Sequence, residues 1–450
     1  MQIPAQRLFS NRKLIAMIIP LILENFFILL VGFVDGIMVS TVGEAAISGI
    51  SLVNSISGIV ISLFVSLSAG GAIVTSQFLG AGKRDRAQQS AGQLILMVAG
   101  VSTLFSIACL LLTKELLVLC FGNAEQDVMD AAVTYFRIIA FSFPLVGLNS
   151  AGTVIFRCSG NTGVSLKVSL ISNLVNVVGN AICIYGLNMG VAGAAIPTLI
   201  SRGVSVVLIF GLLQRSKDAL RPAKEDLKTV DWPVIKDMLK LGLPAAFEGC
   251  MFHLGSVLSL SMITLFGTHH ITAHSTAITL IQFTNIPVNC LNSLSLMIIG
   301  QCVGAKDEIQ IRYYVRKLMC IGYVASWIVM IAMYLLRYPL LSLYASLSEE
   351  TVRLTVTVMT INLSCGLFLF TPSFFLSGPL RAANDSMYTM LVGVLSMMVL
   401  RLGIAYVLCV VMEMGVVGVW IAMVIDWVNR SAWFGGRYLS GAWKKKCGMA

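Results

Sequence analysis

Four carboxylates interrupt stretches of sequence that are otherwise almost entirely apolar: Glu24 and Asp35 in the first stretch, Glu248 in the seventh and Asp426 in the twelfth. A charge at the centre of a bilayer costs at least ~2.5 kcal/mol, so each carboxylate is a candidate for binding a cation. Glu24 and Asp35 lie eleven residues apart, about three helical turns, and can line one cavity wall. Each acid can instead pair neighbouring helices. For Asp426 we favour that reading, because Arg430 follows one turn later.

Uncharged polar residues and two arginines accompany these acids. Asn176 and Asn180 are one turn apart in the fifth apolar stretch, and Thr198 lies in the sixth. Their oxygens can converge with a carboxylate on a small cation, although asparagines also join helices without binding anything. Arg202 and Arg401 either neutralise buried carboxylates or extend to the membrane surface, and the sequence leaves both open.

Two prolines fall inside apolar stretches, each four residues before an acid: Pro20 before Glu24, and Pro244 before Glu248. A proline removes one backbone hydrogen bond and permits a helix to bend, which is tolerated in membranes. The bend can serve movement or be a static kink.

The elements that must position these residues are membrane-spanning helices. The chain has 450 residues, 57% apolar and only 12% charged, against about 25% charged in soluble domains. Its apolar runs are long enough to cross about 30 Å of hydrocarbon as helix. No cleavage site follows a short apolar core near the N-terminus, so the first run reads as an anchor. We predict twelve spans, near 14–39, 47–78, 89–113, 131–156, 164–187, 191–214, 241–266, 274–303, 318–346, 351–378, 388–412 and 416–436.

The distribution of basic residues predicts the orientation. If both termini are cytoplasmic, most of the 31 Lys and Arg lie in cytoplasmic segments, as the positive-inside rule requires. We therefore expect a multi-pass protein of a bacterial inner membrane with both termini inside. The net charge of +10 is spread over short loops, which argues against nucleic-acid binding.

The chain is duplicated. A shift of 224 residues places Pro20 on Pro244, Glu24 on Glu248 and Arg157 on Arg381, and a shift of 225 places Met189 on Met414. Six spans per repeat is an even number, so the halves are parallel repeats. We expect an N-terminal lobe over residues 1–214, a cytoplasmic linker over 215–240 and a C-terminal lobe over 241–450, an architecture suited to alternating access.

Other chemistry finds little support. The eleven cysteines are scattered without CxxC spacing and read as small core residues. His270 and His274 are one turn apart, but no carboxylate or thiol joins them, so we predict no metal site and no cofactor. No nucleophile–base or HExxH constellation is present, and we predict that the protein is not an enzyme.

Four motifs together resemble the multidrug and toxic compound extrusion (MATE) family across essentially the whole chain. They are Val34 to Ser40 with Gly43 and Glu44, Ser76 to Lys83, Asn176 to Asn180 followed by Gly190 to Thr198, and Arg430 to Trp443. The resemblance implies an all-α polytopic protein of twelve helices in two pseudo-symmetric six-helix lobes. It implies proton- or sodium-coupled export of organic cations or amphipathic compounds, and we expect the protein to function as a monomer.

The resemblance also assigns residues. It implies a cation site in the N-terminal lobe at Asp35, Asn176, Asn180 and Thr198, with Asn180 standing where relatives carry a second acid. We also expect Glu248, Glu24 and Tyr135 to hold substrate or a second cation, and the resemblance implies bending at Pro20, whose repeat counterpart is Pro244. The alternative is a flippase for lipid-linked saccharides in the same superfamily, which would need a larger cationic cavity than Arg202, Arg401 and Arg157 can supply.

Overall fold

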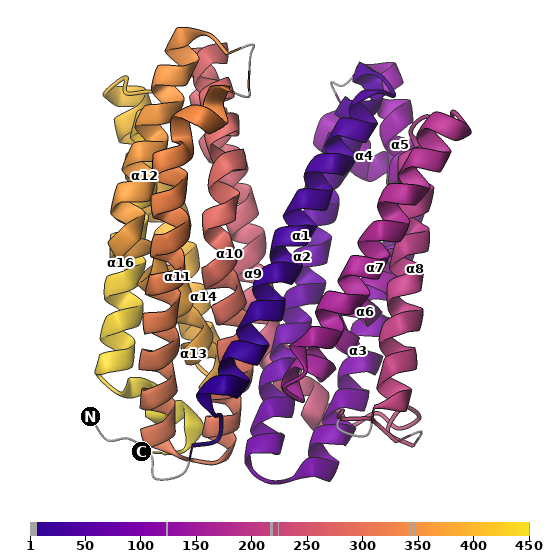
Figure 1. Ribbon diagram of the computed structural model, residues 1–450, viewed down its shortest axis with the longest axis vertical. Coiled ribbons are helices and arrows are strands. Elements are labelled where there is room, and N and C mark those ends of the chain that lie inside the picture. Colours follow the sequence, from indigo (N-terminus) through magenta and orange to yellow (C-terminus); the bar gives the residue numbers. More distant parts are fainter. Residues whose placement is uncertain are drawn as a thin grey trace. The chain divides into compact units, whose positions relative to one another are not determined.

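The computed structural model describes residues 7–122, 125–216, 219–223, 225–342, 344 and 347–449, and helices make up the regular structure of these ranges (Figure 1). In chain order the helices are α1 Asn11–Ser40, α2 Glu44–Gly80, α3 Arg84–Leu111, α4 Thr113–Phe121, α5 Gln126–Phe141, α6 Phe143–Cys158, α7 Thr162–Ala181, η1 Ile182–Gly186, α8 Ala192–Arg215, α9 Trp232–Ile263, η2 Thr264–Phe266, α10 Thr268–Gly304, α11 Glu308–Ser342, α12 Glu349–Phe375, α13 Ser377–Ala382, α14 Ser386–Leu395, η3 Ser396–Arg401, α15 Leu402–Ala405, η4 Tyr406–Val411, α16 Val416–Leu439 and η5 Ala442–Cys447.

These helices confirm the prediction of an all-α polytopic membrane protein. Within the described ranges, ten helical segments are long and apolar enough to cross a bilayer. An eleventh span is formed by α5 and α6 together, which meet at a bend of 43°. The twelfth predicted span is α16, whose apolar run is interrupted by Asp426, Asn429 and Arg430. Each of the twelve predicted spans thus corresponds to one helical stretch.

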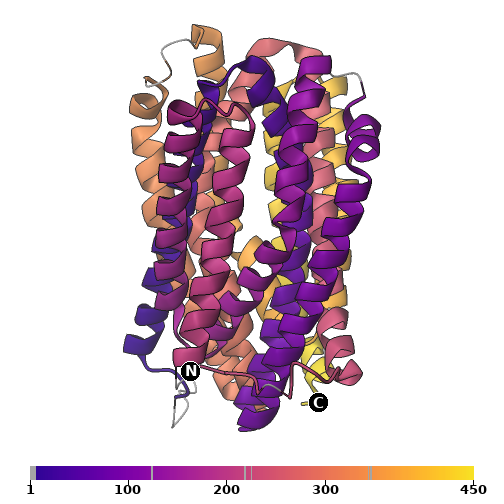
Figure 2. The same cartoon turned by 90° about the vertical axis from the view of Figure 1, so that its right-hand side faces the viewer.

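The chain divides into two compact units. The N-terminal lobe comprises Phe9–Ala246, and the C-terminal lobe comprises Phe247–Ala450 together with Arg7 and Leu8. The first half of α9 therefore belongs to the N-terminal lobe, where it packs closely on α2: a Cβ built on Gly70 would lie 2.4 Å from the Met238 carbonyl oxygen. Helices of this lobe run side by side along its length (Figure 2).

The two repeats share their turn geometry. Gly190 and Gly415 precede α8 and α16, and each has φ of 57°. Gly82 ends the turn after α2 with φ of 73°, and Lys306 occupies the matching place after α10 with φ of 53°. A lysine in this left-handed region pays a steric penalty that glycine avoids. The shared backbone conformation supports the duplication read from the sequence.

The surface of the helices is apolar where a soluble protein would be polar. Leu119 is 83% exposed, Val207 73% and Leu335 69%, whereas Phe64, Phe136 and Phe143 are fully buried. Large exposed aliphatic side chains on several helices are expected where lipid is the solvent.

The segment predicted as a linker, 215–240, is docked on α3. Gln93, which is fully buried, donates to the carbonyl oxygens of Asp226 at 3.0 Å and Thr229 at 2.8 Å and accepts from the Asp231 amide at 2.9 Å. Residues 217, 218 and 224 of this segment lie outside the described residues. Its last residues form the start of α9.

Candidate functional site

A cavity of about 390 Å³ lies inside the N-terminal lobe, mainly among α1, α6, α7 and α8. Glu24 and Asp35 both line it from α1. The opposite walls are rich in small polar side chains. These are Asn149 and Thr153 on α6, Ser165, Ser169, Ser172, Asn173 and Asn176 on α7, and Thr198, Ser201, Arg202 and Ser205 on α8.

Asp35 is held by the two asparagines that the sequence singled out. Asn180 donates its amide to Asp35 Oδ1 at 2.9 Å. The Asn176 amide satisfies its neighbours when its nitrogen faces the carboxylate, donating to Asp35 Oδ2 at 2.9 Å and Oδ1 at 3.1 Å while its oxygen accepts from Thr198 Oγ1 at 3.1 Å. The structure therefore brings together all four residues of the predicted cation site.

This cluster contains the ligand types that a small hard cation takes. The Oδ1 atom of Asn180 is buried and has no hydrogen-bond donor. If the Asn176 amide turns over, its oxygen also faces Asp35, and the cluster changes from donors stabilising a carboxylate to oxygens surrounding a positive charge. The same carboxylate can alternatively take a proton. Chemically, the arrangement can bind and release one proton or one monovalent cation.

Glu24 is paired with an arginine. Arg157 Nη2 lies 3.0 Å from both Glu24 carboxylate oxygens, and Glu24 is only 7% exposed. This ionic partner of Glu24 was not predicted from the sequence. The signal was present, however, because the repeat that aligns Glu24 with Glu248 also aligns Arg157 with Arg381, at the same separation along the chain.

Three serines form a second set that sequence reasoning missed. Ser205 donates to Ser172 Oγ at 2.7 Å, and Ser172 donates to the Ser201 carbonyl at 2.9 Å. Serine is too common in helices for its sequence position to predict a cavity. Arg202 also lines the cavity, and its guanidinium donates to the Ser142 hydroxyl at the bend between α5 and α6.

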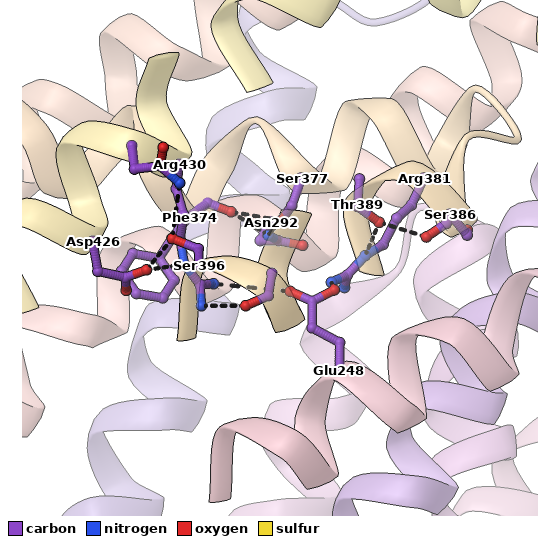
Figure 3. Close-up of polar contacts among 12 residues, drawn as sticks. Glu248, Asn292, Phe374, Ser377, Arg381, Ser386, Thr389, Ser396, Asp426 and Arg430 are labelled. Atoms are coloured by element: carbon purple, nitrogen blue, oxygen red, sulfur yellow. Dashed lines mark hydrogen bonds and ion pairs between the residues drawn. The ribbon is translucent and has the colours of Figure 1, made fainter. Parts of the chain in front are cut away.

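The C-terminal lobe contains a chain of buried ion pairs (Figure 3). Arg381 Nη2 lies 2.7 Å from Glu248 Oε2, and Arg430 Nη1 lies 3.9 Å from Glu248 Oε1. Arg430 Nε also contacts Asp426 Oδ1 at 3.0 Å, which confirms the one-turn pair expected from the sequence. Asp426 additionally accepts from the Ser396 hydroxyl. Glu248 is thus engaged by two arginines.

The repeat relates the two sets of residues. Ser172, Ser201 and Ser205 in the N-terminal lobe correspond to Ser396, Asp426 and Arg430 in the C-terminal lobe. Two of these three positions carry charged side chains in place of serine, so equivalent positions line a cavity in one lobe and form ion pairs in the other. Asp35 corresponds to Ser259, which is 2% exposed and donates within its own helix to Gly255 O.

The remaining predicted residues lie elsewhere. Tyr135 is 7% exposed within an apolar cluster with Phe64, Phe136 and Phe143, and it is not among the residues lining the cavity. Pro20 and Pro244 lie inside α1 and α9, each of which continues through its proline. Arg401 is 7% exposed, with its guanidinium 5.6 Å from the Phe252 ring centroid.

The two histidines considered for metal binding join α10 to α16. His270 Nδ1 accepts from the Val416 amide at 3.1 Å, and His274 Nδ1 accepts from Trp420 Nε1 at 3.2 Å. No group of three or more potential ligands among His, Cys, Asp and Glu occurs within the part of the chain that the structure describes.

The duplicated helical lobes and the polar, acid-containing cavity within one of them define a membrane transporter. The sequence profile of the MatE family matches residues 20–182 and 244–407, one match for each repeat. This chain belongs to the MatE family of multidrug and toxic compound extrusion transporters, which is a family of transporters and not of enzymes.

Similar proteins cover the whole chain. A probable multidrug resistance protein NorM of Thermotoga maritima is 24% identical over 448 residues, spanning 97% of this chain and 94% of the relative. Among solved structures, a MATE in the bent conformation matches with a TM-score of 0.85 at 20% identity, covering 97% of each chain. A MATE in the straight conformation matches with a TM-score of 0.86 at 19% identity, covering 96% of this chain and 97% of the other. The two solved structures show that nearly the whole chain has the same fold.

Proposed function

We propose that this protein exports cationic or amphipathic organic compounds in exchange for a proton or sodium ion, which binds at Asp35. The observation that carries the proposal is that Asp35, Asn176 and Thr198 line one cavity of the N-terminal lobe, while Asn180 donates to Asp35. An acid at such a site must be alternately occupied and released, which is what coupling requires. The name of the Thermotoga maritima relative, a probable multidrug resistance protein, supports organic compounds as the class of substrate.

Substrate or a second cation is proposed to bind at Glu24, Glu248 and Tyr135. These residues differ in what must change before binding can occur. Glu24 reaches the cavity but is neutralised by Arg157, and Glu248 is neutralised by Arg381. A cation would have to displace an arginine to bind either acid directly. Tyr135 can act only after the apolar cluster around it opens. We therefore propose that the first cation binds at Asp35. Its binding is expected to change the contacts of Glu24 and Glu248 with their arginines.

Bending of α1 is proposed to link ion binding to movement. Pro20 removes a backbone hydrogen bond on the same helix that carries Asp35, and Gly32 and Gly36 beside the acid have open space around them. Two similar solved structures are described as a MATE in the bent and in the straight conformation, which supports a fold that takes more than one conformation.

Efflux from proteoliposomes tests the function. We expect a cationic dye to leave vesicles containing the purified protein when a gradient of the coupling ion, proton or sodium, is imposed. No dye should leave when both gradients are absent. The two gradients are applied separately, so the ion that drives export is identified by the same experiment. Dye movement that follows neither gradient would contradict coupled export.

The proposed location is a bacterial inner membrane with both termini in the cytoplasm, and a single chain is proposed as the functional unit. Single cysteines at Lys83 and Lys306 test the orientation, in a background where the eleven native cysteines are replaced by serine or alanine. A membrane-impermeant thiol reagent added to intact cells should not label them, whereas cysteines at Glu115 and Glu349 should be labelled, because those loops follow an odd number of spans. The reverse labelling pattern would overturn the orientation.

A further inference from the structure

A cavity in the C-terminal lobe lies at the end that is proposed to face the cytoplasm. It has a volume of about 790 Å³ and is formed by the first turns of α11, the end of α12 and the last turns of α16. It is separate from the ion-pair chain around Glu248. We call it the basic groove.

One side of the basic groove is apolar. Ile309 and Met319 line it from α11, Pro372 and Leu376 from α12, and Leu439 from α16. The lining residues of α11 run from Glu308 to Met319, which at 1.5 Å per residue is about 16 Å of helix.

The other side of the groove carries an excess of positive charge. Arg312 and Arg316 are exposed and lie one turn apart on α11. Glu308 is the acid at the rim, and it is already shared by Arg312 Nε at 2.8 Å and Lys444 Nζ at 2.7 Å. Among the described residues, no acid pairs with Arg316. One carboxylate therefore faces three cations.

Further basic residues surround the groove. Tyr313 lines it, and Arg7 and Lys317 lie over the Tyr313 ring at 5.5 Å and 5.2 Å from its centroid. Trp443 stacks on Tyr438 at 6.1 Å and so fixes the η5 segment, which contains three consecutive lysines, beside α16. Aromatic and basic residues at the ends of spans are typical of the membrane–water interface.

We propose that the basic groove binds an anionic phospholipid of the cytoplasmic leaflet. Its phosphate lies against Arg312 and Arg316, and one acyl chain lies along the apolar side of the groove. Basic pockets between membrane helices on the cytoplasmic side have the chemistry to bind anionic head groups, because that leaflet is negatively charged. The apolar side of the groove, beside the two arginines, favours a lipid over a free phosphate.

Two glycines of α16 give a matched pair of variants. Gly435 lines the groove, whereas its neighbour Gly436 does not, and a Cβ built on either glycine meets no atom within 4 Å. Gly435→Leu should fill the groove and exclude the acyl chain, and Gly436→Leu should add the same side chain outside it.

For the head group, the double variant Arg312→Gln with Arg316→Gln is compared with Lys83→Gln with Arg84→Gln in the N-terminal lobe.

The experiment is native mass spectrometry of the full-length protein titrated with phosphatidylglycerol or phosphatidylcholine. We expect phosphatidylglycerol to bind more tightly than phosphatidylcholine. The Arg312/Arg316 double variant should weaken phosphatidylglycerol binding roughly tenfold or more, because each basic residue near the surface attracts anionic lipid. Gly435→Leu should weaken this binding to a similar extent, because its side chain occupies the place of the acyl chain. Both control variants should bind like the parent. Glycerol phosphate, which has no acyl chain, should not displace the lipid.

Equal binding of the two lipids would overturn the proposal, as would equal losses of binding in a variant and its control. Displacement of the lipid by glycerol phosphate would also overturn it, because the groove would then be a site for free phosphates. Because lipid binding is measured without a gradient or a substrate, its outcome is independent of the proposed export function.

Discussion

Replacement of Asp35 by asparagine is expected to abolish gradient-driven export while leaving the protein folded. The carboxylate is the group of the Asn176–Asn180–Thr198 cluster that can change its charge, and asparagine has the same shape but neither takes up a proton nor carries a negative charge. We expect the rate of dye efflux under an imposed gradient to fall by at least about tenfold, the effect of losing ~1.4 kcal/mol of coupling.

The matched control for Asp35 is Ser169→Ala. Ser169 lines the same cavity from α7 and can be shortened without removing a charge. This variant should export dye at close to the parental rate. Binding of the dye by Asp35→Asn, measured by fluorescence without a gradient, should persist, because the variant loses ion exchange and not the cavity. If well-expressed Asp35→Asn exported dye as fast as the parent protein, the coupling ion would bind elsewhere.

Spans and their order were predictable because the apolar runs and the repeat are local or periodic properties of the chain. The lateral contacts between spans were less predictable from the sequence. The pairing of Asp426 with Arg430 was predicted because both lie on one helix, one turn apart. The pairing of Glu24 with Arg157 joins α1 to α6, and no helical period relates these two residues.

The residues of the site were predictable only in part. Asp35, Asn176 and Asn180 were identified by polar side chains in apolar surroundings and by their family pattern. The serines of α7 and α8 were not, because their importance comes from small volume, which only the packed lobe reveals. In the C-terminal lobe, Glu248 was selected as a solitary acid, whereas the structure surrounds it with Arg381 and Arg430.

The two lobes therefore treat equivalent acids differently, and this leads to the second large expected effect. Glu24 has Arg157 as its ionic partner within the described residues, whereas Glu248 has a second arginine, Arg430, at 3.9 Å. Arg157→Gln should leave the Glu24 charge buried and unpaired, at a cost of roughly 3–5 kcal/mol. Arg381→Gln should cost less, because Arg430 can still compensate Glu248.

Thermal unfolding of the purified variants in one detergent tests this difference. We expect the melting temperature to fall most for Arg157→Gln and less for Arg381→Gln. The double variant Glu24→Gln with Arg157→Gln should recover most of the loss, because two neutral amides can hydrogen-bond where a lone carboxylate cannot be compensated. If the double variant were no more stable than Arg157→Gln alone, the loss would come from the packing of the Arg157 side chain rather than from the uncompensated charge of Glu24.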